Sequence, residues 1–288
     1  MKVTGFTIIR NAVKYDFPIV EAICSALPLC DEFVVAIGNS DDDTIGLIKG
    51  IGSDKIRIEH TIWDDSLREG GTVLARETDK AFAMISPDTD WCLYLQADEI
   101  IHEADHDKIR AAMQRHKDDK RIDGLIFDYL HFHGSYRHIS IDPSNFKSEV
   151  RIIRNNKAIY SYLDAQGFRK GDSVKLDVAH TGARIFHYSK VKDPALMQKK
   201  HVECSRYWYT DDYIADNLTG KDEYDFADCL LSIFKGTHPA VMAPRIARAT
   251  WVFEHNPSDN KFSLKKRLKI FVEKLGFNVS YQNYHKIA

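Results

Sequence analysis

The stretch Trp91–Glu103 reads W-C-L-Y-L-Q-A-D-E-I-I-H-E. Its first part, 91–95, has no charge and is rich in aromatic and aliphatic side chains, as in a short strand buried on both faces of a parallel sheet. Gln96, Asp98 and Glu99 follow directly. Carboxylates at the carboxyl end of such a strand lie where open α/β sheets bind ligands, and one there suits a divalent cation that carries a diphosphate. The competing interpretation is that Asp98 only caps a helix.

Strand and helix patterns alternate through the residues before this stretch. Apolar, β-rich runs predict strands, and apolar residues at helical spacing predict helices between them. This alternation predicts a parallel, doubly wound sheet with right-handed crossovers. The strands are expected at 3–9, 33–37, 55–59 and from 91, and the helices near 18–27, 44–51 and 72–85.

Polar residues follow the end of each predicted strand. They are Arg10, the turn 39–43, the loop 63–71 and Asp98. Because the carboxyl ends of parallel strands meet at one edge of a sheet, these residues are expected to form a ligand cleft.

Composition narrows the class of protein. The 288 residues, with 44% apolar and 28% charged side chains, are typical of a soluble globular protein of one large domain. A net charge of −2 gives no reason to expect a nucleic-acid partner. The five scattered cysteines favour reduced thiols, and no segment resembles a signal peptide or a membrane span. We therefore expect a cytoplasmic protein.

Several motifs in the first half occur in the order found in family 2 glycosyltransferases of the GT-A fold, and the chain resembles the bacterial members of that family. Three motifs of the second half look like the acceptor side of the same proteins. The motifs are F-T-I-I-R-N (6–11), V-V-A-I-G-N-S-D-D-D-T (34–44), G-G-T-V-L-A-R-E (70–77), Y-L-Q-A-D-E (94–99), E-V-R-I-I-R-N (149–155), Y-L-D-A-Q-G-F-R-K (162–170) and R-I-F-H-Y (184–188).

The resemblance implies a metal site for Mg²⁺ or Mn²⁺. Asp98 matches the second, metal-binding Asp of the family's Asp-any-Asp motif, and Gln96 replaces the first. One carboxylate together with phosphate oxygens is enough to hold either cation. His187 resembles a histidine that ends a strand near the metal, and a hydrogen-bonded core histidine is the alternative interpretation.

The resemblance also implies a site for a nucleotide-diphosphate sugar. Arg76 matches an arginine near the nucleotide, where its planar fork suits a phosphate. Arg10 stands where the family contacts the base. Gly38 replaces an Asp that recognises uracil, so Asn39 or Asp42 is expected to contact the base or ribose instead. The alternative for Asp42 is a solvated turn that caps a helix.

A carboxylate of the second half is expected to act as the catalytic base. An inverting transferase needs one to take the proton from the acceptor hydroxyl. Asp164 is the first candidate and Glu149 the second. The alternative is that Asp164 forms a salt bridge with Arg169 or Arg154.

His131 and His133 lie two residues apart in a predicted strand, so their rings should point to one face. A metal site there is possible, but no third ligand stands at a diagnostic spacing. We favour an acceptor-binding loop, with simple packing as the alternative. Further strands are expected at 124–130, 150–153 and 184–188, and further helices at 104–116, 194–208 and 221–234.

The segment 261–276 is basic and amphipathic, with Leu264, Leu268, Phe271 and Leu275 at helical spacing. It could lie on an anionic membrane surface near a lipid-linked acceptor. The favoured interpretation is a helix whose apolar face packs on the domain while its basic face is solvated.

The sequence thus predicts one continuous GT-A-like α/β unit. Residues 1–123 form the nucleotide-sugar half, and residues 124–288 form an α+β acceptor half with C-terminal helices. The expected function is metal-assisted transfer of a sugar, with inversion, from a nucleotide-diphosphate sugar to a hydroxyl of a glycan or lipid-linked acceptor in bacterial surface glycan synthesis. Two alternatives remain: a non-catalytic relative that binds a nucleotide or glycan, and a sugar-nucleotide nucleotidyltransferase. The oligomeric state is open.

Overall fold

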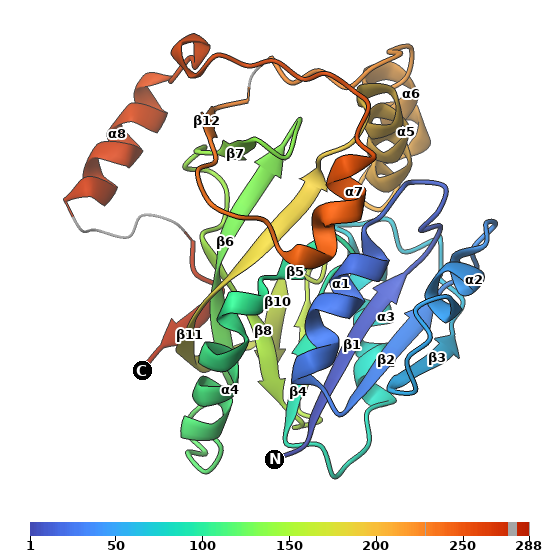
Figure 1. Ribbon diagram of the computed structural model, residues 1–288, viewed down its shortest axis with the longest axis vertical. Helices are drawn as coiled ribbons and strands as arrows, with labels where there is room; N and C mark the ends of the chain where they lie inside the picture. The colour runs from blue at the N-terminus through green and yellow to red at the C-terminus, as the bar shows by residue number, and fades with distance from the viewer. Residues whose placement is uncertain (228, 276–280, 288) are drawn as a thin grey trace.

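The computed structural model describes residues 1–227, 229–275 and 281–287. It has a mixed α/β architecture with a large, mostly parallel, curled sheet, which confirms the expected fold class (Figure 1). The predicted alternation of the first half is present. Its strands are β1 (Val3–Ile9), β2 (Glu32–Ile37), β3 (Ile56–His60) and β4 (Trp91–Tyr94), and its helices are α1 (Ile19–Ala26), α2 (Thr44–Lys49) and α3 (Thr72–Ala83).

The second half extends the same sheet, in the order β3-β2-β1-β4-β8-β6-β11-β10-β9. The first four strands are mutually parallel, β8 runs antiparallel to both β4 and β6, and β11 runs parallel to β6. The division of the chain at residue 123 stays a prediction. The strands are β5 (Glu99–Ile101), β6 (Gly124–His133), β7 (His138–Ser140), β8 (Ser148–Arg154), β9 (Ile159–Tyr162), β10 (Gly167–Lys170), β11 (Val174–Lys190), β12 (Leu231–Ile233) and β13 (Tyr284–Lys286). The helices are α4 (His106–Arg115), α5 (Pro194–Ser205), α6 (Asp211–Asn217), α7 (Ala243–Ala247) and α8 (Leu264–Lys274), with 3₁₀ turns at Leu27–Leu29, Glu103–Asp105, Ala240–Met242 and Pro257–Asp259.

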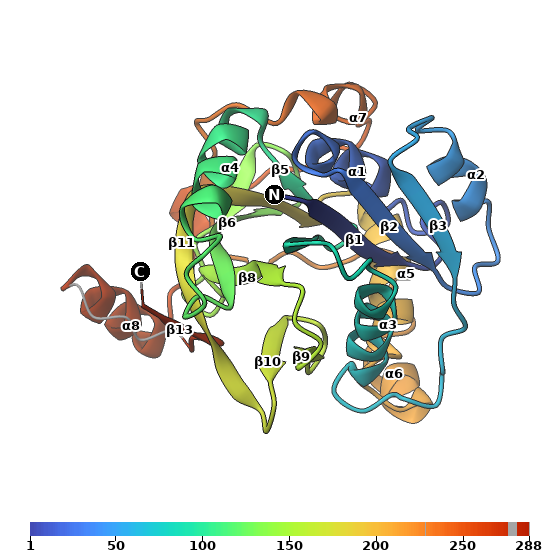
Figure 2. The same ribbon diagram turned by 90° about the horizontal axis from the view of Figure 1, so that it is seen from below.

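Helices cover both faces of the sheet in the first half of the chain. Helices α1, α2 and α4 lie on one face and α3 on the other (Figure 2). Strand β4 has the expected burial on both faces, because Trp91 and Leu93 belong to one apolar core while Cys92 and Tyr94 belong to the other. The side chains of β4 therefore alternate between two packed layers. The polar residues at the carboxyl end of the strand lie at the edge of the sheet, between these layers.

The prediction of a helix at 221–234 is wrong. Within the described residues this segment contains the short strand β12, which pairs antiparallel with β7. Phe234, the last residue of the predicted helix, has its ring centroid 5.0 Å from that of Phe132. A helix forms earlier instead, at α6, where the Thr210 hydroxyl accepts a hydrogen bond from the Tyr213 backbone N–H. The short strand expected at 184–188 is the end of the long strand β11.

Helix α8 forms as expected, but its predicted orientation is wrong. The four apolar side chains predicted to pack on the domain, the last of them just after the helix, are between 59% and 85% exposed. Polar contacts attach the helix to the body: Lys266 Nζ lies 2.6 Å from an Asp142 carboxylate oxygen, Lys269 donates to the Pro143 carbonyl, and Lys147 pairs with Glu273. Lys266 and Lys269 therefore turn toward the body, where carboxylate and carbonyl oxygens accept their hydrogen bonds, and the four exposed apolar side chains turn outward. Those apolar side chains are Leu264, Leu268, Phe271 and Leu275.

In the part of the chain that the structure describes, no helix has both the length and the apolar character that crossing a membrane requires.

Candidate active site

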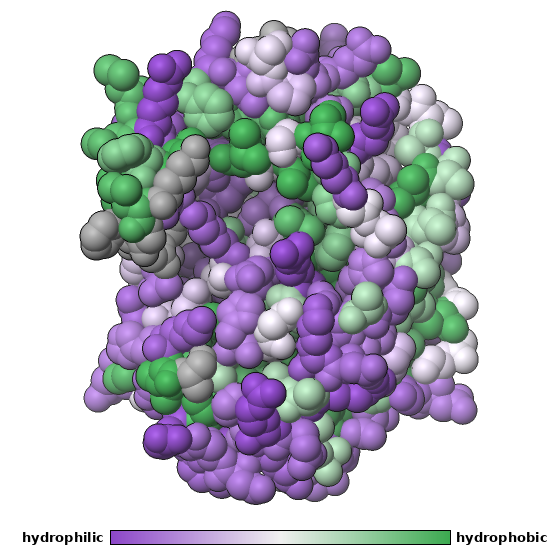
Figure 3. Space-filling view, turned by 60° about the vertical axis from the view of Figure 1, so that its left-hand side comes forward, coloured by the Kyte–Doolittle hydropathy of each residue, from purple (hydrophilic) through white to green (hydrophobic). Residues whose placement is uncertain are grey.

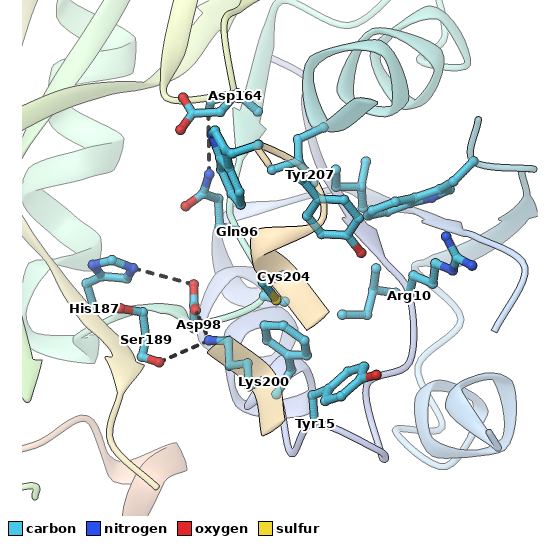
Figure 4. Close-up of a pocket in the computed structure, with 18 of the residues that line it drawn as sticks. Arg10, Tyr15, Gln96, Asp98, Asp164, His187, Ser189, Lys200, Cys204 and Tyr207 are labelled. Carbon is cyan, nitrogen blue, oxygen red and sulfur yellow. Dashed lines mark hydrogen bonds and ion pairs between the residues drawn. The ribbon is translucent and has the colours of Figure 1, made fainter. Parts of the chain in front are cut away.

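A cavity of about 280 Å³ opens at the carboxyl ends of β1 and β4. Side chains from both halves of the chain line the cavity. Helix α5, from the second half, closes the side opposite to the sheet edge (Figure 4). The lining includes Arg10, Tyr15 and Trp63 from the first half, Gln96 and Asp98 after β4, and Asp164, His187, Lys200, Cys204, Tyr207 and Trp208 from the second half.

Asp98 lies in the turn between β4 and β5, so the alternative that it caps a helix is wrong. One carboxylate oxygen, Oδ2, accepts a hydrogen bond from Lys200 Nζ at 3.1 Å. The other, Oδ1, lies 3.6 Å from His187 Nε2. Lys200 Nζ also donates to the Ser189 carbonyl at 3.0 Å. Asp98 is thus the centre of a buried charge network, and the dashed lines of Figure 4 trace it.

The charge state of Asp98 follows from this network. Burial alone would raise the pKa of its carboxyl, but the Lys200 ammonium and His187 outweigh burial and hold the pKa below its ordinary value. Asp98 is therefore an anion at neutral pH. A buried anion of this kind attracts cationic groups and keeps them fixed.

The two predicted metal ligands, Asp98 and His187, lie side by side in the cavity. Their facing atoms, Oδ1 and Nε2, lie 3.6 Å apart, and carboxylate oxygen and imidazole nitrogen are both donor atoms for divalent cations. Gln96 is engaged elsewhere, with Nε2 3.4 Å from the Ala165 carbonyl. Among the described residues no three His, Cys, Asp or Glu side chains gather into a metal-binding group. A cation here would consequently need phosphate oxygens or water as its remaining ligands.

His187 has a second histidine behind it. Its Nδ1 lies 2.9 Å from Nδ1 of His131, and Nε2 of His131 lies 2.8 Å from the Phe146 carbonyl. Burial, together with the neighbouring His187, lowers the pKa of His131 to about 4. His131 therefore belongs to the support of the site; it is buried and does not line the cavity.

Asp164 faces the same cavity from the segment between β9 and β10. Its neighbours Leu163 and Ala165 have φ angles of 53° and 61°, in the left-handed region that such side chains seldom adopt. Burial raises the pKa of the Asp164 carboxyl. Its Oδ1 atom is buried and has no hydrogen-bond partner within the described chain.

The salt bridge considered for Asp164 is not formed. In the described residues the guanidinium of Arg169 donates to backbone carbonyls of Phe168 and Asn283, and that of Arg154 donates to carbonyls near the end of α4. Asp164 is thus a carboxylate with no cation partner in these residues, held by a strained backbone at the wall of a cavity.

Glu149 lies outside the cavity, which argues against the second candidate base. It is buried in β8 beside the Glu99–Arg151 ion pair. Burial, with the nearby Glu99 charge, raises its pKa to about 8 from an ordinary 4.5, although Arg151 opposes the shift. One oxygen, Oε2, has no hydrogen-bond partner among the described residues.

The position of Glu149 predicts a pH-dependent stability. Between pH 4.5 and about 8 the folded protein holds a proton that the unfolded chain has released, so the free energy of unfolding falls as the pH rises through this window. We expect Glu149→Gln to raise the free energy of unfolding at pH 8 by on the order of 3 kcal/mol, with little change near pH 4.5. Urea unfolding at both pH values measures it. The exposed Glu223→Gln is the control, and an equal effect of Glu149→Gln at both pH values would contradict the prediction.

Of the residues predicted to contact the nucleotide, Arg10 and Gln96 line the cavity. Arg10 pairs with Asp65 at 2.5 Å on the side opposite to His187 (Figure 4). Asn39, Asp42 and Arg76 do not line it. Asn39 accepts from the Trp63 backbone N–H and Asp42 from the backbone of Lys14 and Thr44, while Arg76 is an exposed residue of α3.

Gly38 has a steric reason to lack a side chain. A Cβ atom there would lie 2.4 Å from Nε1 of Trp63. The Trp63 indole therefore occupies the space that an aspartate at this position would need. The loop 63–71 supplies an aromatic wall in its place.

The sequence did not single out Lys200 or the aromatic residues Tyr207 and Trp208. Lys200 stands three residues after Met197 and four before Cys204, so it lies on the same helix face as these apolar side chains. A lysine on an apolar helix face was the available signal. Its partner, Asp98, is far away in the sequence and gives no local indication.

No protein-family model matches this chain, and no curated protein matches it in sequence. Among solved structures, it is similar to S. aureus TarS at 13% identity and a TM-score of 0.39, over 71% of this chain and 39% of that chain. A structure of S. aureus TarS 1–349 gives 13% identity and 0.38, over 77% and 67%. Glucosyl-3-phosphoglycerate synthase from Mycobacterium tuberculosis, in complex with Mn²⁺, uridine diphosphate and phosphoglyceric acid, gives 17% identity and 0.33, over 44% and 43%. The chain thus spans well under half of the first TarS chain.

Proposed function

We propose that this protein is a glycosyltransferase that moves a sugar from a nucleotide-diphosphate donor to a hydroxyl acceptor. One observation carries the proposal. An ionised Asp98, surrounded by Lys200 and His187 at the carboxyl end of β4, lines the same cavity as Asp164, which has no cation partner in the described chain. The group of Asp98, Lys200 and His187 suits the binding of a leaving diphosphate, and the Asp164 carboxylate can accept a proton.

Charge and shape place the diphosphate of the donor on one side of the cavity and its base on the other. Lys200 Nζ uses two of its three N–H groups on Asp98 and Ser189 in the described chain, so a third is available to a phosphate oxygen. On the other side, the rings of Trp63 and Tyr207 contact each other at an interplanar angle of 50° near Arg10 and offer apolar faces to a base.

Asp98 Oδ1 and His187 Nε2 are the atoms proposed to hold Mg²⁺ or Mn²⁺ together with oxygens of the diphosphate. Such a cation would supply positive charge against the charge that develops on the departing diphosphate. Lys200 already supplies a permanent cation beside the same carboxylate, so the chain contributes part of this stabilisation itself.

The proposed reaction is a direct displacement. The acceptor oxygen forms a bond to the anomeric carbon while the bond from that carbon to the diphosphate oxygen breaks. The hydroxyl proton passes to the Asp164 carboxylate, and the nucleoside diphosphate leaves. Attack from the face opposite to the leaving group inverts the anomeric configuration, and the configuration of the product tests this point.

We expect Asp164→Asn to lower kcat for transfer by roughly 10²- to 10⁴-fold, because the amide cannot accept the proton. Donor affinity should stay within a few fold, since Asp164 is not proposed to contact the diphosphate. Release of nucleoside diphosphate from a panel of nucleotide sugars, with acceptor present, measures kcat. The exposed Asp172→Asn in the turn after β10 is the matched control. Full activity of Asp164→Asn would remove this residue from the mechanism.

The acceptor is proposed to be presented at an anionic membrane surface by α8, as expected of a lipid-linked intermediate in bacterial surface glycan synthesis. The apolar side chains of α8 face outward, and the exposed Lys265 and Arg267 lie on the same helix. Figure 3 shows hydrophobic surface over this helix with hydrophilic side chains around it. An apolar stripe bordered by cations fits lipid tails and anionic headgroups.

A vesicle flotation experiment tests this placement. We expect the protein to float with phosphatidylglycerol vesicles and not with phosphatidylcholine vesicles, and Leu268→Asp with Phe271→Asp to reduce the bound fraction at least tenfold. The control is Val174→Asp, an exposed apolar residue elsewhere on the surface. Equal binding by all variants, or concentration-dependent self-association through α8 in place of vesicle binding, would contradict the assignment.

A further inference from the structure

Arg68 joins the loop 63–71 to the end of helix α5. Its guanidinium donates from Nε to the Arg206 carbonyl at 2.9 Å and from Nη2 to the Tyr209 carbonyl at 2.7 Å. Its Nη1 and Nη2 atoms also lie 3.0 Å from the two carboxylate oxygens of Asp211. These contacts span sequence separations of 138 to 143 residues, so Arg68 connects the first half of the chain to the second.

The backbone that Arg68 binds carries two side chains of the cavity. Carbonyl groups at the end of a helix have no partner within the helix. The loop provides partners here, because the Gly71 N–H donates to the Tyr207 carbonyl at 2.9 Å, between the two carbonyls that Arg68 binds. The side chains of Tyr207 and Trp208 line the cavity from this fixed segment, 206–209.

Gly71 brings the same loop against Asp164. A Cβ atom on Gly71 would lie 2.5 Å from Cβ of Asp164 and 2.9 Å from Nε1 of Trp208. With a φ angle of 70°, Gly71 also has a backbone conformation that L side chains rarely adopt. The loop, the proposed base and the Trp208 indole are therefore in close contact, and a displacement of the loop would displace both side chains.

We propose that Arg68 is a positioning residue that holds Trp208 in place beside Asp164. Arg68 is not among the described residues that line the cavity, so it acts through the segment it binds. A planar guanidinium suits this role, since its rigid fork can bind two carbonyls and a carboxylate at once. The inference rests on the proposed function, in which Asp164 takes the acceptor proton, and it adds the contact that keeps the cavity wall next to that base.

Two matched pairs of variants separate this role from a general loss of stability. The test variants are Arg68→Met and Gly71→Ala. Arg206→Met is the control for the first, because Arg206 pairs with the same carboxylate but its ion pairs in the described chain stay within its own segment, 203–211. Gly70→Ala is the control for the second, since Gly70 has a similar φ angle of 60° but a Cβ atom there would meet nothing within 4 Å.

The first readout does not depend on turnover. The protein has four tryptophans, so fluorinated tryptophan gives four ¹⁹F NMR resonances, which single Trp→Phe substitutions assign. We expect the Trp208 resonance to shift or broaden in both test variants, because its indole is no longer held in one environment. The resonances of Trp91 and Trp251, which do not line the cavity, should stay in place, and both control variants should leave the Trp208 resonance unchanged.

The second readout is a split between kcat and KM. Release of nucleoside diphosphate is measured over a panel of nucleotide sugars, with glycerol as a simple hydroxyl acceptor. Both test variants should lower kcat roughly 10- to 100-fold, because a small displacement of the wall misplaces the acceptor relative to Asp164. KM for the donor should stay within a few fold, since Tyr207 keeps its ring contact with Trp63 at 5.7 Å.

These outcomes separate two failures. An unchanged Trp208 resonance or a wild-type kcat in a folded Arg68→Met protein would overturn the positioning role, and so would equal effects in a test variant and its control. If Arg68→Met does not fold, Gly71→Ala decides by the same two readouts. Absence of nucleoside diphosphate release in the wild type would overturn the proposed function, while the ¹⁹F readout would still decide whether Arg68 positions Trp208.

Discussion

Replacing Asp98 by asparagine is expected to lower the rate of sugar transfer by roughly 10³-fold or more. The substitution removes the anion that fixes Lys200 and faces His187, while it leaves the size of the side chain unchanged. Metal-dependent stabilisation by nucleoside diphosphates should disappear as well, because the proposed cation loses its only carboxylate ligand. The measurement is nucleoside diphosphate release, combined with thermal unfolding against a panel of nucleoside diphosphates with Mn²⁺ or a chelator.

The design of this experiment distinguishes the alternatives. The exposed Asp88→Asn serves as the matched control, since Asp88 lies away from the cavity. A wild-type protein that is stabilised by a nucleoside diphosphate but transfers no sugar would favour the non-catalytic relative. Release of pyrophosphate from a nucleoside triphosphate and a sugar phosphate would favour the nucleotidyltransferase. Full transfer activity in Asp98→Asn would refute the assigned centre.

Arg151→Met is expected to reduce the free energy of unfolding by about 3–5 kcal/mol. Arg151 and Glu99 are both fully buried, and the guanidinium donates to both carboxylate oxygens at 2.8 Å. Loss of the arginine would leave Glu99 as an uncompensated buried charge next to Glu149. Because Glu99 also accepts from the Tyr129 hydroxyl and the Gln96 backbone, the turn that carries Asp98 would lose part of its support.

A double substitution isolates the physical cause. Glu99→Gln together with Arg151→Met should be less destabilising than Arg151→Met alone, since it removes both charges. Arg121→Met, at an exposed ion pair with Asp119, should change stability by less than about 1 kcal/mol. Urea unfolding midpoints with unchanged slopes provide the comparison. If the single and double variants were equally unstable, packing of the arginine stem, and not its charge, would be the cause.

Local patterns were sufficient where local physics decides the structure. The strand β1 has the predicted bounds, α2 begins after Asp43 as a capped helix, and β4 is buried on both faces before its polar end. Strands and helices that alternate in close succession form a parallel sheet. Asp98 follows β4, so it lies at the edge of that sheet where ligands bind.

Tertiary contacts decided the remaining features. The orientation of α8 was wrong from the sequence because acidic and carbonyl partners on the body, and not helix periodicity, select the face that turns inward. Part of the segment predicted as a helix at 221–234, Leu231–Ile233, forms a strand, since β7 is available there as a ladder partner. Glu149 has a carboxylate as a base requires, but β8 buries it beside Arg151 and away from the cavity.

The sequence by itself determined the α/β class and placed Asp98 after a buried strand, because residue type and strand pattern are local properties, and the family resemblance added Asp164 and His187 as candidates. Only the tertiary structure decided which groups act on them. Lys200 meets Asp98 across a sequence separation of 102 residues, and His131 meets His187 across 56. Charge and exposure depend on such distant neighbours, and no local pattern encodes them.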